Sequence, residues 1–213
     1  MSIIEKLYRS HFGYFMSLLI RQIAYIHKPF MAYGYYDYAS KCFRKYTRLS
    51  STVSIMNKRN IAMGDFVWVW HYTILDATEG LTVGTGCQIG AWVGIFTHGS
   101  ENSIRLLGNE FVNTPNSMRT GYTRGKIKIG DFTFVGARSI ILPGVNIGKG
   151  CLIASGTLVT KDIPDYSLVV GSPGRIVGST LEIDKRFFES HDYSSTYYDI
   201  DALKILKQLK KGN

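Results

Sequence analysis

Cysteine is scarce in this sequence, and its three cysteines, Cys42, Cys87 and Cys151, stand far apart with no CxxC pair and no cysteine–histidine cluster. This spacing excludes the usual zinc sites and indicates reduced thiols in a cytoplasmic protein. We therefore expect no bound metal. The GxGxxG and P-loop motifs are missing too, which excludes the two common glycine-rich loops that bind nucleotide phosphates.

Proline is also scarce, with 5 residues against 22 glycines, and there is no low-complexity tract. The hydrophobic content of 45% is enough for a real core, and 213 residues fit one domain with appendages. No cleavable signal peptide is evident. The first apolar run begins only after Lys6, Arg9 and His11, and no small-residue cleavage site follows it.

Acidic residues are nearly missing from the first sixty positions, where ten lysines and arginines face only Glu5 and Asp37. No nucleic-acid-binding motif accompanies this charge, so we expect no nucleic-acid partner. The apolar stretch Phe12–Ile26 is too short to span a bilayer and contains Arg21. Two interpretations stay open: residues 1–30 lie on an anionic membrane surface, or they form a helix that packs on the domain with its basic face in water.

What the sequence does have is a repeat of six residues. From residue 129 it divides into IGDFTF, VGARSI, ILPGVN, IGKGCL, IASGTL and VTKDIP, and each block opens with isoleucine or valine. Neither a helix nor an ordinary strand has this period. Coils of short parallel strands joined by tight turns do, with one β-branched side chain of each strand turned inward. Gly130, Gly136 and Gly148 then fit corners that need a positive φ or a close backbone approach.

The repeat is looser in the N-terminal half and breaks at a histidine. Aliphatic residues recur at 49, 55, 61 and 67 and again at 83, 89 and 95, which suggests an irregular corner at Thr73–Glu79 between the two series. After Ile95 the chain reads FTHGS, and about thirty residues follow before the register resumes at Ile129. A connection this long inside a compact domain is usually functional, so His98 at its start is a candidate catalytic residue.

The block Val135–Val177 resembles the hexapeptide-repeat acyltransferases, above all the sugar O-acetyltransferases, including those of surface-polysaccharide clusters. The likeness covers about residues 50–178. It implies a mainly β fold with a left-handed parallel β-helix. The expected domains are a basic, partly helical segment at 1–48, the β-helix at 49–178 with an excursion loop at 99–126, and a C-terminal tail at 179–213 with a short helix.

The resemblance also implies an activity. We expect an acetyl-CoA-dependent O-acetyltransferase that modifies a sugar hydroxyl in surface-polysaccharide (O-antigen or capsule) biosynthesis. Its acceptor would be a small molecule or a glycan, acetyl-CoA its donor, and its assembly a homotrimer in the cytoplasm or at the inner face of the membrane. Two alternatives stay open: N-acylation of a nucleotide-linked amino sugar, and a catalytically silent β-helix scaffold.

For catalysis the resemblance points to His98, because imidazole titrates near neutrality and suits a general base acting on a hydroxyl. A carboxylate on its second nitrogen would orient the ring, as in hydrolase triads. Glu101 is the nearest in sequence and is expected as the second catalytic residue, while Asp76 could reach the ring from the preceding coil. Asp76 and His71 are expected near the acceptor. Galactoside-type relatives have asparagine close to the position of Val69.

For the cofactor, the likeness matches residues in the last three coils. Backbone groups at Ala137, Ser155 and Thr160 are expected to line acetyl-CoA, and Lys161 and Arg175 to contact its phosphates. The family's usual Asn-Pro-Ala is Ser-Pro-Gly here, at residues 172–174, which keeps the turn that proline favours.

Overall fold

The computed structural model of this protein describes residues 10, 12, 15, 16 and 29–211. By its contacts the chain forms two compact units, residues 1–30 and 31–213. The membrane anchor or packed helix expected in residues 1–30 falls almost entirely outside the described residues and stays a prediction. None of the helices in the described part of the chain has the length and apolar character needed to cross a membrane.

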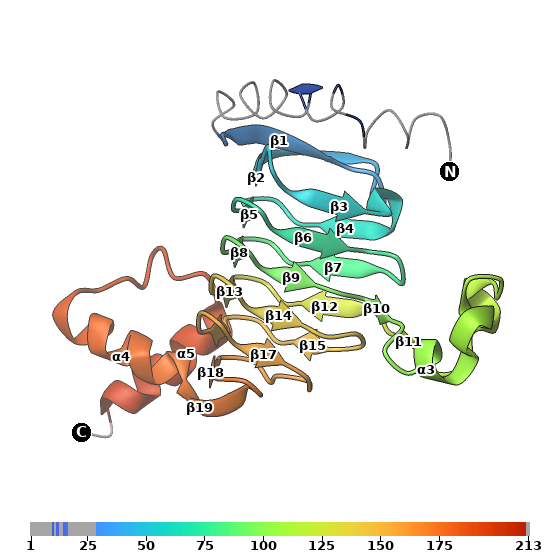
Figure 1. The fold of residues 1–213 in the computed structure, drawn as a ribbon. Helices are drawn as coiled ribbons and strands as arrows, with labels where there is room; N and C mark the ends of the chain where they lie inside the picture. The colour runs from blue at the N-terminus through green and yellow to red at the C-terminus, as the bar shows by residue number, and fades with distance from the viewer. Residues whose placement is uncertain (1–9, 11, 13–14, 17–28, 212–213) are drawn as a thin grey trace. The chain divides into compact units, whose positions relative to one another are not determined.

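Residues 31–179 wind into a parallel β-helix, in which each full coil adds one short strand to each of three sheets (Figure 1). The first sheet runs β1-β2-β5-β8-β13-β16-β18-β19. Its strands are Met31–Asp37, Cys42–Ser50, Trp68–Val69, Gln88–Ile89, Phe134–Val135, Leu152–Ile153, Ser167–Val170 and Arg175–Ser179.

The second sheet runs β17-β14-β9-β6-β3 and the third β15-β12-β7-β4. The strands of the second are Leu158–Val159, Ile140–Ile141, Gly94–Ile95, Ile74–Asp76 and Ser54–Met56, and those of the third are Asn146–Ile147, Ile127–Ile129, Leu81–Val83 and Ile61–Met63. Pairing between successive coils is parallel throughout the two sheets. The predicted left-handed parallel β-helix is confirmed.

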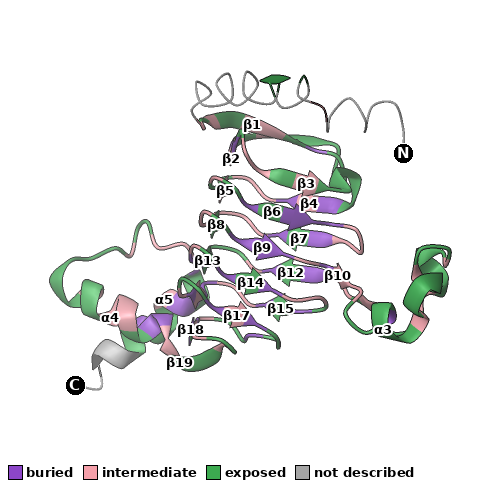
Figure 2. Cartoon of the chain, viewed as in Figure 1, coloured by how far each residue is buried: buried purple, intermediate pink, exposed green. Residues whose placement is uncertain are grey.

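The core is the column of inward aliphatic side chains that the six-residue repeat predicts. The block-opening residues from 129 to 159 are all at most 2% exposed, and those at 129, 135 and 141 pair in register with those at 147, 153 and 159 on the next coil. On β14, for example, Ile141 is fully buried and its neighbour Ile140 is 40% exposed. Figure 2 shows this buried column running through the coils, while the segments that leave the β-helix are mostly exposed.

In the N-terminal half the six-residue repeat is interrupted within strands, and not at the irregular corner expected at residues 73–79. In register, Leu49 pairs with Val69 and Val69 with Ile89, so each coil here is 20 residues long. Coils of the C-terminal half repeat after 18 residues, as Val135 pairs with Ile153. The additional residues are in the three-residue strands of the third sheet. Both Leu81 and Val83 of β7 point inward, as their burial shows.

Corner glycines are required by close contact between coils. A Cβ atom on Gly136 would lie 2.4 Å from the backbone nitrogen of Ser155, and one on Gly130 would lie 2.5 Å from the nitrogen of Lys149. Neither glycine has a positive φ, so of the two reasons expected from the sequence, the close approach of one coil to the next applies at both positions.

Antiparallel hairpins end the first sheet on both sides. Strands β1 and β2 pair at the N-terminal end, and β18 and β19 pair at the C-terminal end. The domain boundary expected at residue 48 therefore lies inside β2, which pairs with β5 of the β-helix. Such hairpins occupy the open edges that a β-helix would otherwise present at its ends.

The excursion leaves the β-helix after β9 and returns beside its own start. It comprises β10 (His98–Gly99), α3 (Ser103–Leu107), η2 (Gly108–Phe111), η3 (Asn116–Met118) and β11 (Thr123–Arg124). Strands β10 and β11 pair antiparallel, with His98 opposite Arg124. This pairing brings the two ends of the excursion together at one edge of the coil (Figure 1).

Two helices follow the β-helix, where the sequence suggested one. They are α4 (Thr180–Ser190), which Ser179 caps through a hydrogen bond to the backbone of Leu181, and α5 (Ile200–Lys211). Leu181 of α4 and Ala202 and Leu206 of α5 form a small buried cluster. Ile200, the first residue of α5, is 72% exposed.

The inward column predicts unequal effects for two neighbouring isoleucines. Ile141→Ala should lower the free energy of unfolding by about 2–5 kcal/mol, because it opens a cavity in the stacked core. Ile140→Ala on the same strand is the matched control and should cost less than about 1 kcal/mol, since its side chain is already partly in solvent. Urea unfolding followed by circular dichroism measures both, and equal losses would contradict the inward stacking.

Candidate active site

An imidazole and a carboxylate meet where the excursion leaves the β-helix. Asp76 ends β6, and His98 lies just beyond β9, the next strand of the same sheet. The Nδ1 atom of His98 is 2.7 Å from Oδ2 of Asp76. No aligned hydrogen-bond partner of Nδ1 exists among the described residues, so this is a close approach of ring and carboxylate, not an ideal hydrogen bond.

Asp76 is fully buried, and backbone and hydroxyl donors surround its carboxylate. Oδ1 accepts hydrogen bonds from the backbone N–H and the hydroxyl of Thr78, and Oδ2 accepts from both groups of Thr97. Burial alone would raise the pKa of this carboxyl. The four hydrogen bonds outweigh it and lower the pKa from 3.8 to about 2. The group is therefore a fixed negative charge at neutral pH.

The imidazole is held between the carboxylate and an aromatic ring from the excursion. Tyr122 stacks on His98 with 5.7 Å between ring centroids and 17° between planes. The guanidinium of Arg124 lies 4.9 Å from the Tyr122 ring. The side chain of His98 is 24% exposed, and its Nε2 has no hydrogen-bond partner in the part of the chain that the structure describes. Nε2 is therefore the nitrogen left to act on a ligand.

Glu101, the acid nearest to His98 in sequence, has a different partner. Its carboxylate accepts a hydrogen bond from the hydroxyl of Thr123 on β11. That bond, with a smaller contribution from Arg105, lowers the pKa of Glu101, whose side chain is exposed. Glu101 thus ties the two ends of the excursion together, and the carboxylate in contact with the imidazole is that of Asp76.

His71 lies at a different corner of the coil. It occupies the turn between β5 and β6, and its Nδ1 is 2.5 Å from the hydroxyl of Ser50. Backbone hydrogen bonds stack this corner on the turn that contains Trp92 in the next coil, and that turn on the one that contains Ala137. His71 is therefore not brought into contact with Asp76 or His98.

The residues expected to bind the cofactor fall at two corners and on the last hairpin. Ala137 and Ser155 belong to stacked turns of one corner, where the N–H of Gly156 donates to the carbonyl of Ala137. Thr160 and Lys161 follow β17, two strands from β9, the strand that leads to His98. Arg175 opens β19. All but the half-buried Ala137 are exposed and lie on the outside of the coils.

The cysteines are poor candidates for a covalent intermediate. Cys87 and Cys151 are buried, and burial raises the pKa of the Cys87 thiol to about 12 and also raises that of Cys151. A thiol is nucleophilic as its thiolate, so neither residue is activated. Cys42 is exposed on the N-terminal hairpin. No group of three or more potential metal ligands occurs among the described residues.

Sequence reasoning missed three residues of this site. Thr78 and Thr97 donate to Asp76, and Tyr122 covers the imidazole. The threonines carry a weak sequence signal, because each lies one or two residues from a candidate residue. Tyr122 lies 24 positions after His98 and carries no such signal, since only the fold of the excursion brings it back.

Comparison with known proteins agrees with this architecture. Residues 126–161 match the model of the hexapeptide repeat of succinyl-transferase. A protein named as an acetyltransferase, YvoF of Bacillus subtilis, is 46% identical over 69 residues, which are 32% of this chain and 40% of that protein. Serine acetyltransferase 4 of Arabidopsis thaliana is 33% identical over 40% of this chain and 24% of its own length.

Two solved structures share the fold. A maltose O-acetyltransferase from Clostridium difficile superposes with a TM-score of 0.50 and 25% identity, over 61% of this chain and 64% of that one. A hexapeptide-repeat acetyltransferase from Vibrio cholerae, complexed with acetyl-CoA, gives a TM-score of 0.51 at 21% identity, over 60% of this chain and 64% of that one. Over its coils the chain is similar to hexapeptide-repeat acetyltransferases.

The chain spans less than half the length of the curated relatives that it matches. The match to the repeat model lies in the C-terminal coils, where the repeat is strict. The part of the chain that holds the imidazole and the carboxylate lies N-terminal to the matched repeat.

The lowered pKa of Asp76 predicts a stability that depends on pH. Because the folded-state pKa lies below the unfolded value of 3.8, the ionised carboxylate stabilises the fold above about pH 4, and this contribution is lost as the pH falls through about 2. Between about pH 6 and pH 2, the difference in unfolding free energy between wild type and Asp76→Asn should shrink by about 2 kcal/mol.

Urea unfolding at several pH values measures this difference. Glu101→Gln is the control, and its difference from wild type should change less with pH, because solvent screens an exposed carboxylate. A wild-type to Asp76→Asn difference that stays constant over this range would contradict the assignment.

Proposed function

We propose that this protein is an acetyl-CoA-dependent O-acetyltransferase whose acceptor is a sugar hydroxyl. The single observation that supports it most is the contact between His98 and Asp76, at the point where a long excursion leaves a hexapeptide-repeat β-helix. The fixed charge of Asp76 favours the proton on Nδ1, which leaves Nε2 as the base. A role in surface-polysaccharide biosynthesis is part of the same proposal.

In the proposed step, Nε2 of His98 takes the proton of the acceptor hydroxyl as its oxygen attacks the thioester carbonyl. The tetrahedral intermediate collapses with cleavage of the carbon–sulfur bond. The imidazolium returns the proton to the departing sulfur, so that the products are the acetyl ester and free CoA. Asp76 stabilises the imidazolium throughout, and its four hydrogen bonds keep it ionised.

Tyr122 and Glu101 have supporting roles in this proposal. The Tyr122 ring limits rotation of the imidazole by stacking on one of its faces. Glu101 holds Thr123 and with it the start of β11, so it acts on the site through the excursion. Asp76 touches the ring and not the acceptor, and His71 would meet an acceptor only where that acceptor reaches the neighbouring corner.

Acetyl-CoA is a substrate in this proposal, and the outer surface of the coils fits it. Ala137, Ser155 and Thr160 offer backbone groups at turns with small side chains, which allow a long ligand to lie close to the coils. Lys161 and Arg175 are exposed cations without an ion-pair partner among the described residues, and they suit the phosphates. We propose a homotrimer in which a second chain completes each donor site.

The proposed location is the cytoplasm or the inner face of the membrane, where acetyl-CoA is available. Contact with the membrane would come from residues 1–30, whose surplus of basic residues suits anionic lipids.

Replacement of His98 tests the base directly. His98→Ala should lower kcat by about 10²–10⁴, the usual contribution of a positioned general base. Acetyl-CoA binding should survive, because the proposed donor contacts lie elsewhere. Release of CoA thiol in the presence of a sugar panel measures kcat, and calorimetry measures donor binding. Near-normal turnover in His98→Ala would refute the proposal, and absence of acetyl transfer by wild type to any acceptor would favour a scaffold.

The proposed contacts of Lys161 and Arg175 with acetyl-CoA predict a change in KM and not in kcat. Lys161→Ala and Arg175→Ala should each raise the KM for acetyl-CoA by about three- to tenfold, the effect of a lost charge-assisted contact after allowance for solvent exposure. The KM for the acceptor should change less. Lys185→Ala on α4 is the control. An unchanged KM for acetyl-CoA in both variants would show that the phosphates bind elsewhere.

A further inference from the structure

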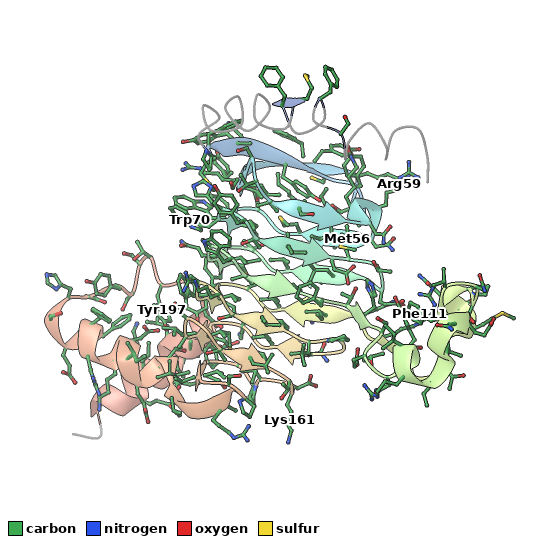
Figure 3. The ribbon with its side chains drawn as sticks, viewed as in Figure 1. Met56, Arg59, Trp70, Phe111, Lys161 and Tyr197 are labelled. Carbon is green, nitrogen blue, oxygen red and sulfur yellow. The ribbon has the colours of Figure 1, made fainter. Side chains whose placement is uncertain are left out.

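A hollow opens at the turn between β3 and β4, on the edge of the β-helix where the candidate active site lies. Its volume is about 440 Å³, and its lining residues are Ile55, Asn57, Lys58, Arg59 and Asn60. Residues 58–60 form the 3-10 turn η1 (Lys58–Asn60), entered through Asn57 in a left-handed conformation. Figure 3 shows Arg59 extending from this turn at the edge from which the excursion also departs.

The hollow is joined to the imidazole by a continuous set of contacts. The Asn57 side-chain amide donates to the hydroxyl of Thr78 at 2.8 Å, and this hydroxyl donates to Asp76 at 2.6 Å. Asp76 in turn meets His98. The Asn60 amide donates to the carbonyl of Thr78 at 3.2 Å. Thr78 is therefore shared by the hollow and the carboxylate that orients the ring.

Strand register sets the separation of the two places. Met56 at the end of β3 pairs with Asp76 at the end of β6, and β6 pairs with β9, which leads to His98. Neighbouring strands lie about 4.8 Å apart, so the coil of the hollow is about 10 Å from the coil of the imidazole. An acceptor with a charged group attached close to the sugar being acetylated would span that separation.

The lining of the hollow favours an anion. It contains two exposed cations and two amides, and no carboxylate. The Lys58 ammonium lies 4.7 Å from the Tyr38 ring, an arrangement that holds the cation at the surface. Arg59 has no ion pair in the described part of the chain, so its planar guanidinium is available to the paired oxygens of a phosphate or carboxylate.

We propose that this hollow is an acceptor subsite, which binds an anionic group of the sugar acceptor while His98 acts on a hydroxyl about 10 Å away. The shared chemistry is a phosphate or a carboxylate, carried by a phosphorylated sugar or by an acidic sugar respectively. This inference rests on the proposed function and makes it more specific, because it selects acidic acceptors over neutral ones.

Acceptor kinetics test the subsite. Matched acceptors are a neutral hexose, its 6-phosphate and its uronic acid, so that the two charged forms distinguish phosphate from carboxylate. For the preferred anionic acceptor, Lys58→Ala/Arg59→Ala should raise the KM at least roughly tenfold, as loss of charge-assisted contacts at an exposed site implies. The KM for acetyl-CoA and that for the neutral hexose should not change. Arg59→Lys, which keeps the charge, should raise this KM less than the double variant does.

The control is Lys41→Ala/Lys45→Ala, which removes two exposed cations from the N-terminal hairpin, outside the hollow. It changes the net charge equally and should leave every KM near the wild-type value. If both double variants raised the KM alike, the effect would be one of overall charge, and the subsite would be refuted. An unchanged KM for both anionic acceptors in Lys58→Ala/Arg59→Ala would also refute it.

A binding measurement separates this inference from the proposed function. Calorimetry with pyrophosphate and with glucuronate, in the absence of acetyl-CoA, should show binding of at least one probe to wild type, weakened at least tenfold in Lys58→Ala/Arg59→Ala and weakened by salt. If neutral sugars are acetylated but neither probe binds the hollow, the subsite fails and the proposed function stands. If a probe binds but wild type acetylates no acceptor, both the acceptor role and the proposed function fail.

Discussion

The parallel ladder of hydrogen bonds between successive coils, with one inward aliphatic side chain per strand, is the interaction on which the rest of the structure depends. Each coil is too thin to bury its own apolar face, and stacking supplies the neighbour above and below. The close approach of Gly136 to Ser155 shows how tightly the coils must stack at the corners. Residues at equivalent positions of successive coils therefore lie a fixed distance apart along one edge of the β-helix, which residues on a flexible loop would not.

That spacing creates the candidate active site. Asp76 and Thr97 are 21 residues apart in sequence, yet Thr97 follows β9, the strand that pairs with β6, and donates twice to the buried carboxylate. A buried charge is costly unless donors surround it. Here the donors come from the threonines of two coils, so the charge is maintained only while those coils are stacked. The polar site and the apolar column next to it stabilise each other.

The excursion adds what the rigid coils cannot provide. Stacked coils place similar turns one above another along an edge, and such turns alone would leave the outer face of the imidazole open to solvent. The return of the chain through β11 places Tyr122 against the ring and Arg124 opposite His98. The same edge continues through Thr78 to the hollow at Asn57–Asn60, so the proposed acceptor would lie along one row of coil corners.

The sequence by itself determined the β-helix, its inward residues from Ile129 to Val159 and the excursion after Ile95, because a period of six and its interruption are local patterns. It also marked His98. It could not decide between Asp76 and Glu101, and it gave no sign of Tyr122. Those assignments depend on contacts between residues distant in the chain. Only the register of 20-residue coils brings Asp76 to the imidazole, and only the pairing of β10 with β11 engages Glu101 with Thr123.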